Sequence, residues 1–310
     1  MSLLGFGTET VSSILGARLC ESLGAHTHTH TKLPLLTMFA HQGIQTPRPH
    51  HCDETNELKA QMKSRENPMK FKARLDGVVL SSHGCKLLGG FYGAEGETRR
   101  PTAILLHGVP GVEKNLDFAY ALRDVGWNAL YFHYRGCWGS EGNYSFDGLL
   151  DDIRAATEWA LGQPSVSEEN LALIGSSMGG YAALAAGAVD SQFKALVALC
   201  PLIDPTNVPL PTEMATEFAT MLQGVTATQL KAQWDRLPSI VSMADTLRNR
   251  KILLVTGDQD DLFQPNHYAQ FLKELPNVKW HRFPVGDHSF SACRKELVET
   301  VLVWLRGAGD

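Results

Sequence analysis

Residues 171–184 read LALIGSSMGGYAAL, in which a short apolar run is followed by small residues and then by an alanine-rich run. The apolar run is typical of a buried strand, and the alanine-rich segment favours a helix. The glycines and serines between them predict a sharp turn from strand to helix. One of the two serines could be a nucleophile, or both could simply be turn residues.

The same alternation of apolar runs and helical patterns continues from about residue 70 to the end of the chain. Strands are expected at 71–80, 85–93, 102–108, 128–136, 171–175, 194–201, 251–257 and 278–286. SSHG separates the first two and favours a hairpin, and amphipathic helices are expected between the later runs. This pattern predicts one α/β domain over residues 69–310, with a mostly parallel eight-stranded sheet covered by helices on both faces.

Residues 1–68 have little hydrophobic periodicity and are expected to form a disordered or loosely attached extension. The histidines at 26, 28 and 30, and the group His50, His51 and Cys52, could bind a metal ion. The fixed ligand spacing of a closed zinc site is missing, so a solvated polar tail is the preferred interpretation.

Composition argues against several classes of protein. The net charge is −5 and no run is rich in lysine or arginine, so a nucleic-acid partner is not expected. No stretch approaches the roughly 18 uninterrupted apolar residues that a membrane span needs. The first twenty residues lack the basic segment of a secretory signal, and the six cysteines form no C-x-x-C pair. A cytoplasmic protein with reduced thiols is therefore expected.

The motif G-x-S-x-G occurs at 175–179 and selects Ser177, because Ser176 would need a glycine at the position of Ile174. Such a serine lies on a strained strand-to-helix turn, where side chains at the flanking positions would collide with neighbouring backbone. The motif by itself is weak, since an ordinary turn also favours glycine and serine. The strand before it and the helix after it supply the context that a nucleophile requires.

A serine nucleophile needs a general base that is itself oriented by an acid. Asp258, Asp260 and Asp261 follow the run 251–257, and His288 follows the last run. Ser177, Asp260 and His288 each come just after an expected strand, so we expect them to form a catalytic triad. The alternatives are a solvated loop histidine and a polar turn of aspartates.

An oxyanion hole would use backbone N–H groups. Met178 supplies one, and the loop HGVPG at 107–111 supplies another, for which Val109 is the best positional guess. His107 is expected to shape this loop rather than to act as a base.

From about residue 70 onward the sequence resembles the α/β-hydrolase superfamily. The resemblance consists of HG-x-PG at 107–111, G-x-S-x-G at 175–179, GDQDDLFQP at 257–265 and GDHSF at 286–290. It implies the α/β-hydrolase fold and hydrolytic chemistry. It places the acid at Asp260, with Asp261 as a fallback and Asp204 as a position used in some relatives.

The segment HYRGCWGSEGNYSF at 133–146 resembles the superfamily's loop after the fourth strand, but His133 stands where Asp is common and Trp138 where Gly is common. This departure resembles the branch of dienelactone-hydrolase-like and S9-peptidase-like proteins. Arg135 and Trp138 could line the site, or Arg135 could only tie the loop down.

The resemblance also implies a small helical cap at about 204–249, with one or two amphipathic helices. Possible pocket-lining residues there are Phe218, Met221, Leu222 and Trp234, although the same side chains could equally pack in the core.

Together these features predict a serine hydrolase that cleaves a small-molecule ester or related acyl compound through an acyl-enzyme. No metal or organic cofactor is expected. The alternatives are a peptidase or aminopeptidase of the prolyl-oligopeptidase type and a non-catalytic binding protein with the hydrolase fold.

Overall fold

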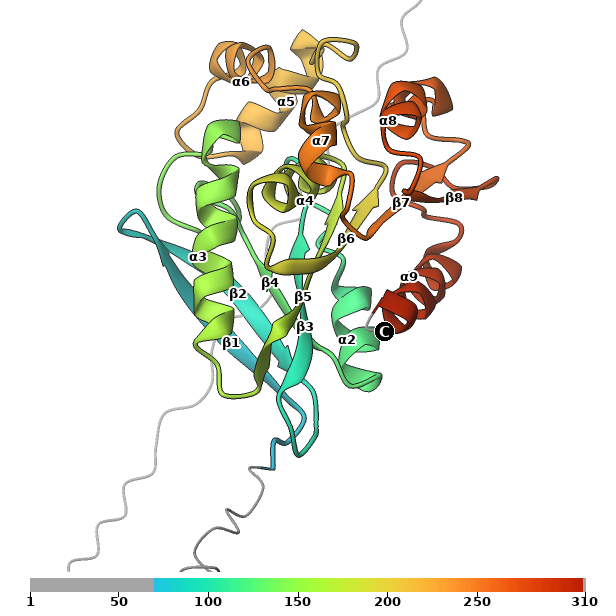
Figure 1. Ribbon diagram of the computed structural model, residues 1–310. Helices are drawn as coiled ribbons and strands as arrows, with labels where there is room; N and C mark the ends of the chain where they lie inside the picture. Colours follow the sequence, from blue (N-terminus) through green and yellow to red (C-terminus); the bar gives the residue numbers. More distant parts are fainter. Residues whose placement is uncertain (1–69, 309–310) are drawn as a thin grey trace, which may run out of the picture. The chain divides into compact units, whose positions relative to one another are not determined.

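The computed structural model describes residues 70–308; the expected extension at 1–68 lies outside the described residues. Within the described range, eight strands form one sheet in the order β1-β2-β4-β3-β5-β6-β7-β8 (Figure 1). The strands are β1 (Arg74–Ser82), β2 (Cys85–Gly93), β3 (Arg100–Leu106), β4 (Asn128–Phe132), β5 (Val166–Ser176), β6 (Phe193–Leu199), β7 (Ile252–Gly257) and β8 (Lys279–Phe283).

The hairpin and the parallel sheet predicted from the sequence are both confirmed. β1 pairs with β2 and β2 pairs with β4 in antiparallel fashion, and all the later neighbours are parallel. β8 ends at Phe283, three residues before the predicted end, because Pro284 follows and cannot donate a ladder hydrogen bond.

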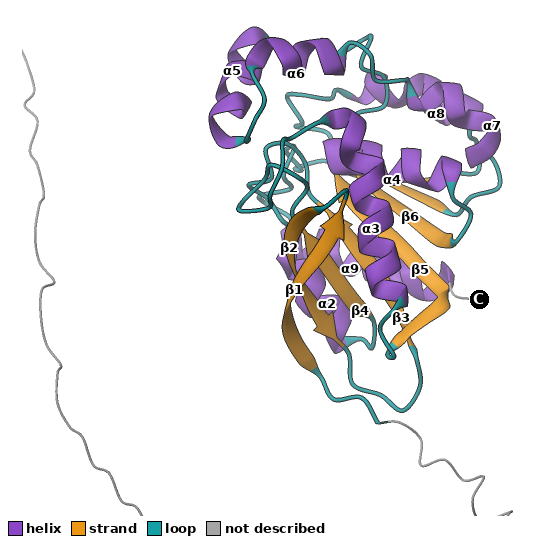
Figure 2. Cartoon of the chain, turned by 90° about the vertical axis from the view of Figure 1, so that its left-hand side faces the viewer, coloured by secondary structure: helices purple, strands orange, loops and turns teal. Residues whose placement is uncertain are grey.

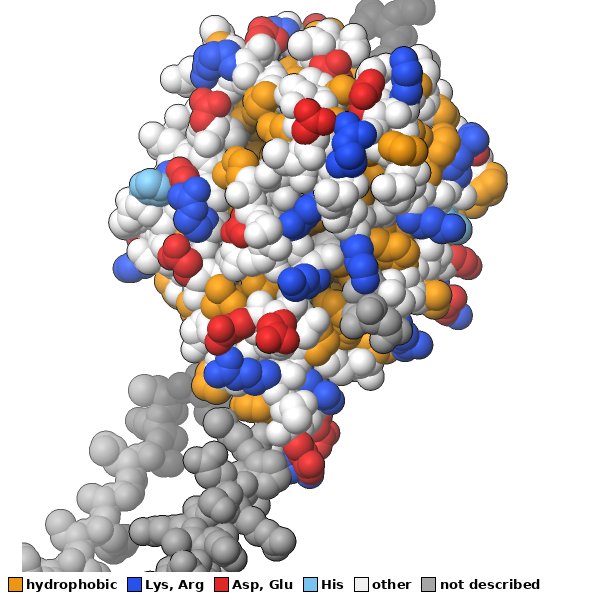
Figure 3. Space-filling view, in the orientation of Figure 1, with side chains coloured by type: hydrophobic (Ala, Val, Ile, Leu, Met, Phe, Trp, Pro, Cys, Tyr) orange, Lys and Arg blue, Asp and Glu red, His pale blue; other side chains and the backbone are white. Residues whose placement is uncertain are grey.

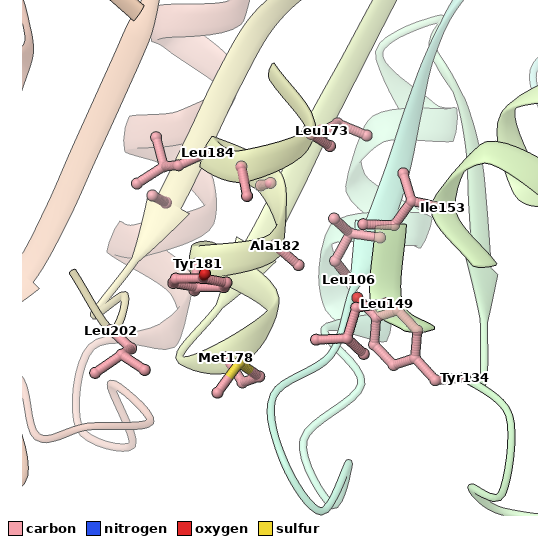
Figure 4. Packing of buried hydrophobic residues seen from close by; sticks show 14 of the residues in the cluster. Leu106, Tyr134, Leu149, Ile153, Leu173, Met178, Tyr181, Ala182, Leu184 and Leu202 are labelled. Carbon is pink, nitrogen blue, oxygen red and sulfur yellow. The ribbon is translucent and has the colours of Figure 1, made fainter. Parts of the chain in front are cut away.

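Helices cover both faces of the sheet. They are α2 (Leu116–Asp124) and α9 (Arg294–Ala308) on one face, and α3 (Leu149–Leu161), α4 (Met178–Val189) and α8 (Ala269–Glu274) on the other. Successive strand residues point to opposite faces. Accordingly Leu105 of β3 packs in the cluster with α2 and α9, whereas Leu106 packs in the cluster with α3 and α4. Figure 4 shows this second cluster, with Leu106 and Ile153 opposite Ala182 of α4.

The segment between β6 and β7 carries α5 (Thr212–Met221), α6 (Ala227–Trp234), a 3₁₀ turn at Ile240–Met243 and α7 (Ala244–Leu247). α5 and α6 lie beyond the end of the sheet (Figures 1 and 2). Thr226 and Gln229 form a capping box that begins α6. The indole Nε1 of Trp234 donates to the carbonyl of Val208 over 2.8 Å, which holds the end of α6 against the incoming chain.

A buried carboxylate ties the hairpin and the loop after β4 to α3. Asp152 is 2% exposed. Its Oδ1 accepts from Ser82 Oγ at 2.7 Å and from Arg135 Nε at 2.7 Å, and its Oδ2 accepts from the Arg135 backbone at 2.9 Å. A charge buried at this depth is stable only when it is paired and hydrogen-bonded in this way.

Acidic and basic side chains are interspersed on the face drawn in Figure 3, where neither sign dominates. Among the described helices, none combines the length and the apolar character needed to cross a bilayer.

His107 and His133 are buried just after β3 and β4, with ring centroids 5.6 Å apart. His107 Nδ1 donates to the Gly108 carbonyl at 2.7 Å, but His107 Nε2 and His133 Nδ1 have no hydrogen-bond partner within residues 70–308. Burial lowers the pKa of His107 to about 4, and burial together with His107 and Lys114 lowers the pKa of His133 to about 3. Both imidazoles are therefore neutral at pH 7.

These histidines make the stability of the domain sensitive to acid. Between the folded pKa and the ordinary value of 6.5, the unfolded chain binds the proton more tightly, so acidification favours unfolding. From about pH 7 to about pH 5 we expect the free energy of unfolding to fall by about 2 kcal/mol per histidine. In His133→Phe this fall should be smaller by about 2 kcal/mol, as measured by urea denaturation at both pH values. Tyr134→Phe, which alters the neighbouring ring but no histidine, is the control; an equal fall in His133→Phe and wild type would contradict the prediction.

Candidate active site

Ser177 occupies the turn between β5 and α4 with φ 55° and ψ −119°. A positive φ at a residue with a Cβ costs about 1–3 kcal/mol and persists only when the surroundings enforce it. Here the backbone N–H of Ser177 donates to the Leu199 carbonyl at 2.8 Å, and its carbonyl accepts from Tyr181 at 3.0 Å. The strained turn is thus fixed from both sides, by β6 and by α4.

Only glycine fits at the two glycine positions of the motif, because any side chain there would collide with backbone. A Cβ at Gly175 would lie 2.1 Å from the Gly179 carbonyl oxygen, and a Cβ at Gly179 would lie 2.1 Å from the Leu106 carbonyl oxygen. Neither obstacle is a flexible side chain, so any larger residue would push β5, α4 and β3 apart. This contact is the physical reason for the spacing that selected Ser177 in the sequence.

His288 lies in the loop between β8 and α9, and Asp260 lies just after β7. His288 Nδ1 is 2.9 Å from Asp260 Oδ2. Ser177 and His288 line the same two cavities. The fold therefore gathers the predicted serine, histidine and aspartate at the carboxyl ends of β5, β8 and β7.

Asp260 is held in its ionised form by its surroundings. Its Oδ1 accepts the backbone N–H groups of Leu262 at 2.8 Å and Phe263 at 3.0 Å. Burial opposes ionisation, but the hydrogen bond and charge of His288, the amide of Phe263 and the thiol of Cys200 outweigh it and lower the pKa of Asp260.

Cys200 is a member of this site that sequence reasoning missed. Burial, followed by the charge of Asp260, raises the pKa of Cys200 well above its ordinary value, so the thiol keeps its proton and can donate to the carboxylate. Cys200 follows β6 directly and has φ 39°. Its position directly after a strand was the one signal in the sequence that it could belong to the site, but a lone cysteine does not reveal its partner.

The other acids weighed as alternatives have different neighbours. Asp258 Oδ1 pairs with Arg282 Nε at 2.9 Å, and Asp261 is exposed. Asp204 accepts from the Thr206 hydroxyl at 2.7 Å and from the Asn207 amide at 2.7 Å. Of these four aspartates, Asp260 is the one whose carboxylate contacts His288.

Two aromatic side chains hold the loop 107–111, one of them its own His107. His107 Nδ1 donates to the Gly108 carbonyl at 2.7 Å, and Trp138 Nε1 donates to the Pro110 carbonyl at 2.9 Å. A Cβ at Gly111 would lie 2.7 Å from His107 Nδ1 and 2.8 Å from Trp138 Nε1. Val109 lies between these anchors and lines both cavities.

Trp138 itself has φ 47°, which is rare for a bulky residue, and Lys114 Nζ lies 4.6 Å from its ring centroid. Neither Trp138 nor Arg135 is among the residues that line the cavities beside Ser177. Trp138 covers the loop that carries Val109, and Arg135 points to Asp152 and to the Gly148 carbonyl.

Within the described chain, two cavities open beside Ser177 and His288. The smaller, of about 170 Å³, lies along the loop 108–113 and also includes Ser176, Ser289 and Arg294. The larger, of about 390 Å³, lies beneath α5 and α6. Of the four cap residues named from the sequence, Phe218 and Trp234 line the larger cavity; Met221 and Leu222 are not among its lining residues.

Ser176 and Arg294 belong to a polar chain beside the smaller cavity. Asn115 Nδ2 donates to Ser176 Oγ at 3.0 Å, and Arg294 Nη2 donates to Asn115 Oδ1 at 3.2 Å. Arg294 also binds both carboxylate oxygens of Asp117, at 2.6 and 2.8 Å. Sequence patterns did not indicate this chain, because its members come from three distant segments.

Comparisons with known proteins agree with this fold. Residues 119–308 match the model of the prolyl oligopeptidase family. An uncharacterized protein of Mycobacterium tuberculosis is 31% identical over 189 residues, which cover 60% of this chain and 62% of that protein. The chain thus spans less than two thirds of this curated relative.

Two solved structures share the architecture. Est1E from Butyrivibrio proteoclasticus has a TM-score of 0.62 at 17% identity and covers 75% of this chain and 98% of its own. The esterase Pf2001 from Pyrococcus furiosus has a TM-score of 0.60 at 20% identity, covering 76% and 91%. These identities show the fold alone. The family model, by contrast, matches well over half of the 310 residues, and the chain belongs to the prolyl oligopeptidase family with an α/β-hydrolase fold.

Proposed function

We propose that this protein is a serine hydrolase that cleaves an ester or related acyl compound through a covalent acyl-enzyme. The observation that carries the proposal is the His288–Asp260 pair at 2.9 Å, which opens onto the same cavities as a serine held at φ 55°. A binding protein with this fold has no need of a strained serine that lines the same cavities as an oriented imidazole.

In the first half of the reaction Ser177 Oγ forms a bond to the substrate carbonyl carbon while His288 Nε2 takes the serine proton. Asp260 accepts from Nδ1, fixes the tautomer and stabilises the imidazolium. The bond to the leaving group then breaks, and His288 returns the proton to the departing atom. In the second half a water attacks the acyl carbon, passes its proton to His288 and releases the acid, and Ser177 recovers its hydrogen.

The carbonyl oxygen becomes negative in each tetrahedral intermediate and needs preorganised donors. We assign this role to the backbone N–H groups of Val109 and Met178. Met178 is the first residue of α4, where amides have no partner within the helix and the helix dipole favours negative charge. Trp138 and His107 position the loop of Val109 from outside the reaction centre.

We propose ester hydrolysis before peptide hydrolysis; the structural neighbour from Pyrococcus furiosus is an esterase, but that likeness concerns the fold. The family name points instead to peptidases, and both reactions would use the same triad. We therefore expect activated esters to be cleaved efficiently and the matching anilide amides slowly or not at all.

The nucleophile can be identified by covalent labelling. A fluorophosphonate probe should label the wild-type protein and Ser176→Ala but not Ser177→Ala, because Ser177 lines both cavities with His288, whereas the Ser176 hydroxyl accepts from Asn115. Gel fluorescence reports the labelling, and mass spectrometry of the labelled peptide gives the residue. An unlabelled wild-type protein would overturn the proposed function.

The acid of the proposed triad can be identified by substituting two aspartates of the loop after β7. Asp260→Asn should lower kcat for a nitrophenyl ester by roughly 10³–10⁴-fold, since an amide stabilises the wrong imidazole tautomer. Asp258→Asn, which loses only the pair with Arg282, should stay near wild type. Circular dichroism melts monitor folding of both variants, and similar rates for the two would contradict the assignment.

The contact from Trp138 can be tested by removing its N–H. Trp138→Phe keeps a ring over the loop but loses the hydrogen bond to Pro110, so we expect kcat to fall roughly tenfold with a smaller change in KM. Trp304→Phe on α9 removes an indole remote from the site and serves as the control. A change in KM alone would assign Trp138 to substrate binding instead.

A further inference from the structure

The larger cavity presents hydrocarbon walls beside the reacting atoms. Leu210, Met214 and Phe218 line it from the cap, and Leu262 and Phe263 line it from the acid loop. The indole N–H of Trp234, which also borders it, is already bound to the Val208 carbonyl. Its ring therefore adds apolar surface and leaves no donor unsatisfied.

The smaller cavity is polar by comparison. Glu113, Ser176, Ser289 and Arg294 border it, and it shares only Val109, Ser177 and His288 with the larger one. The two groups attached to a scissile carbonyl at Ser177 therefore meet different surroundings, since polar groups make up more of the lining of the smaller cavity, although Val112 and Phe290 also border it.

Building on the proposed function, we propose that the larger cavity binds an apolar, uncharged acyl group and that the smaller one takes the leaving group and then the hydrolytic water. The order of the reaction supports this division. After the first step the leaving group departs, and a water must enter beside His288 while the acyl group remains attached to Ser177. The more polar, smaller cavity admits that water, whereas the larger cavity excludes it while the acyl chain fills it.

Two carboxylates set the charge that this acyl group can carry. Glu217 and Asp261 border the larger cavity, and neither has an ion-pair partner within residues 70–308. No lysine or arginine is among its described lining residues. An acyl chain that ends in a carboxylate would meet both like charge and apolar walls, so such substrates should be rejected.

Cavity size is tested with nitrophenyl acetate and nitrophenyl octanoate. The wild type should prefer the octanoate, and Met214→Trp, which narrows the cavity, should lower the octanoate-to-acetate ratio of kcat/KM roughly tenfold. Met221→Trp introduces the same side chain on the same helix at a position that does not line the cavity, and it should keep the wild-type ratio. An unchanged ratio in Met214→Trp would overturn the acyl assignment.

Charge selection is tested with two acyl chains of equal length, nitrophenyl hexanoate and the mononitrophenyl ester of adipic acid. Wild-type kcat/KM should be far lower for the adipate, and Glu217→Gln should raise the adipate value roughly fivefold with little change for hexanoate. Glu213→Gln, on the same helix but outside the cavity lining, is the matched control. Added salt should raise the wild-type adipate value, because exposed carboxylates are screened. Equal rates for the two esters in the wild type would overturn the charge argument.

Failure of this inference is distinguishable from failure of the proposed function. If the fluorophosphonate probe and nitrophenyl acetate both react at Ser177 but chain length and charge have no effect, the acyl assignment falls and the hydrolase remains. If neither reacts, the hydrolase and the acyl assignment fall together.

Discussion

The close approach of β3, β5 and α4 around Ser177 is the constraint on which the rest of the site depends. Gly179 lies so near the end of β3 that a single added carbon would reach the Leu106 carbonyl, and Gly175 packs equally tightly on Gly179. The loop 107–111 continues directly from Leu106. This contact places the loop beside Ser177, where a Cβ at Gly108 would lie 3.0 Å from the Ser177 Cβ. The proposed nucleophile and the proposed oxyanion donor, Val109, therefore depend on the same close approach.

Electrostatic contacts and burial then set the ionisation state of the side chains that this packing brings together. Asp260 is fully buried, yet two amides, the His288 ring and the Cys200 thiol surround its oxygens and hold it ionised. By contrast, His107 and His133 are kept neutral by burial and support the neighbouring loops. His288 thus has a carboxylate partner, whereas the rings of His107 and His133 have none among the described residues, and this difference separates the proposed base from these two histidines.

In the proposed reaction, α5 and α6 contribute to selectivity without entering the chemistry. The hydrogen bond from Trp234 to Val208 attaches α6 to the chain that leads into α5. Apolar side chains of both helices line the larger cavity beside Ser177. The opposite side is bounded by the polar chain from Ser176 through Asn115 to Arg294. In a mechanism with two half-reactions, such asymmetry lets one cavity retain the acyl group while the other exchanges alcohol for water.

Much of the fold was predictable from the sequence, because its determinants are local. Strand and helix periods predicted the eight strands and the helices on both faces, and the glycine spacing selected Ser177. The contact between Gly175 and Gly179 that requires the first glycine is local, whereas Gly179 meets Leu106 of β3. Asp260 and His288 each follow an expected strand, and parallel strands end at one edge of the sheet, so their meeting near Ser177 could be expected. The tertiary structure alone decided that Trp138 binds Pro110, that Arg135 turns to Asp152, that Cys200 meets Asp260, and that Phe218 but not Met221 lines the cavity. Each of these depends on residues from separate segments meeting in space, and no local period or propensity encodes such a meeting.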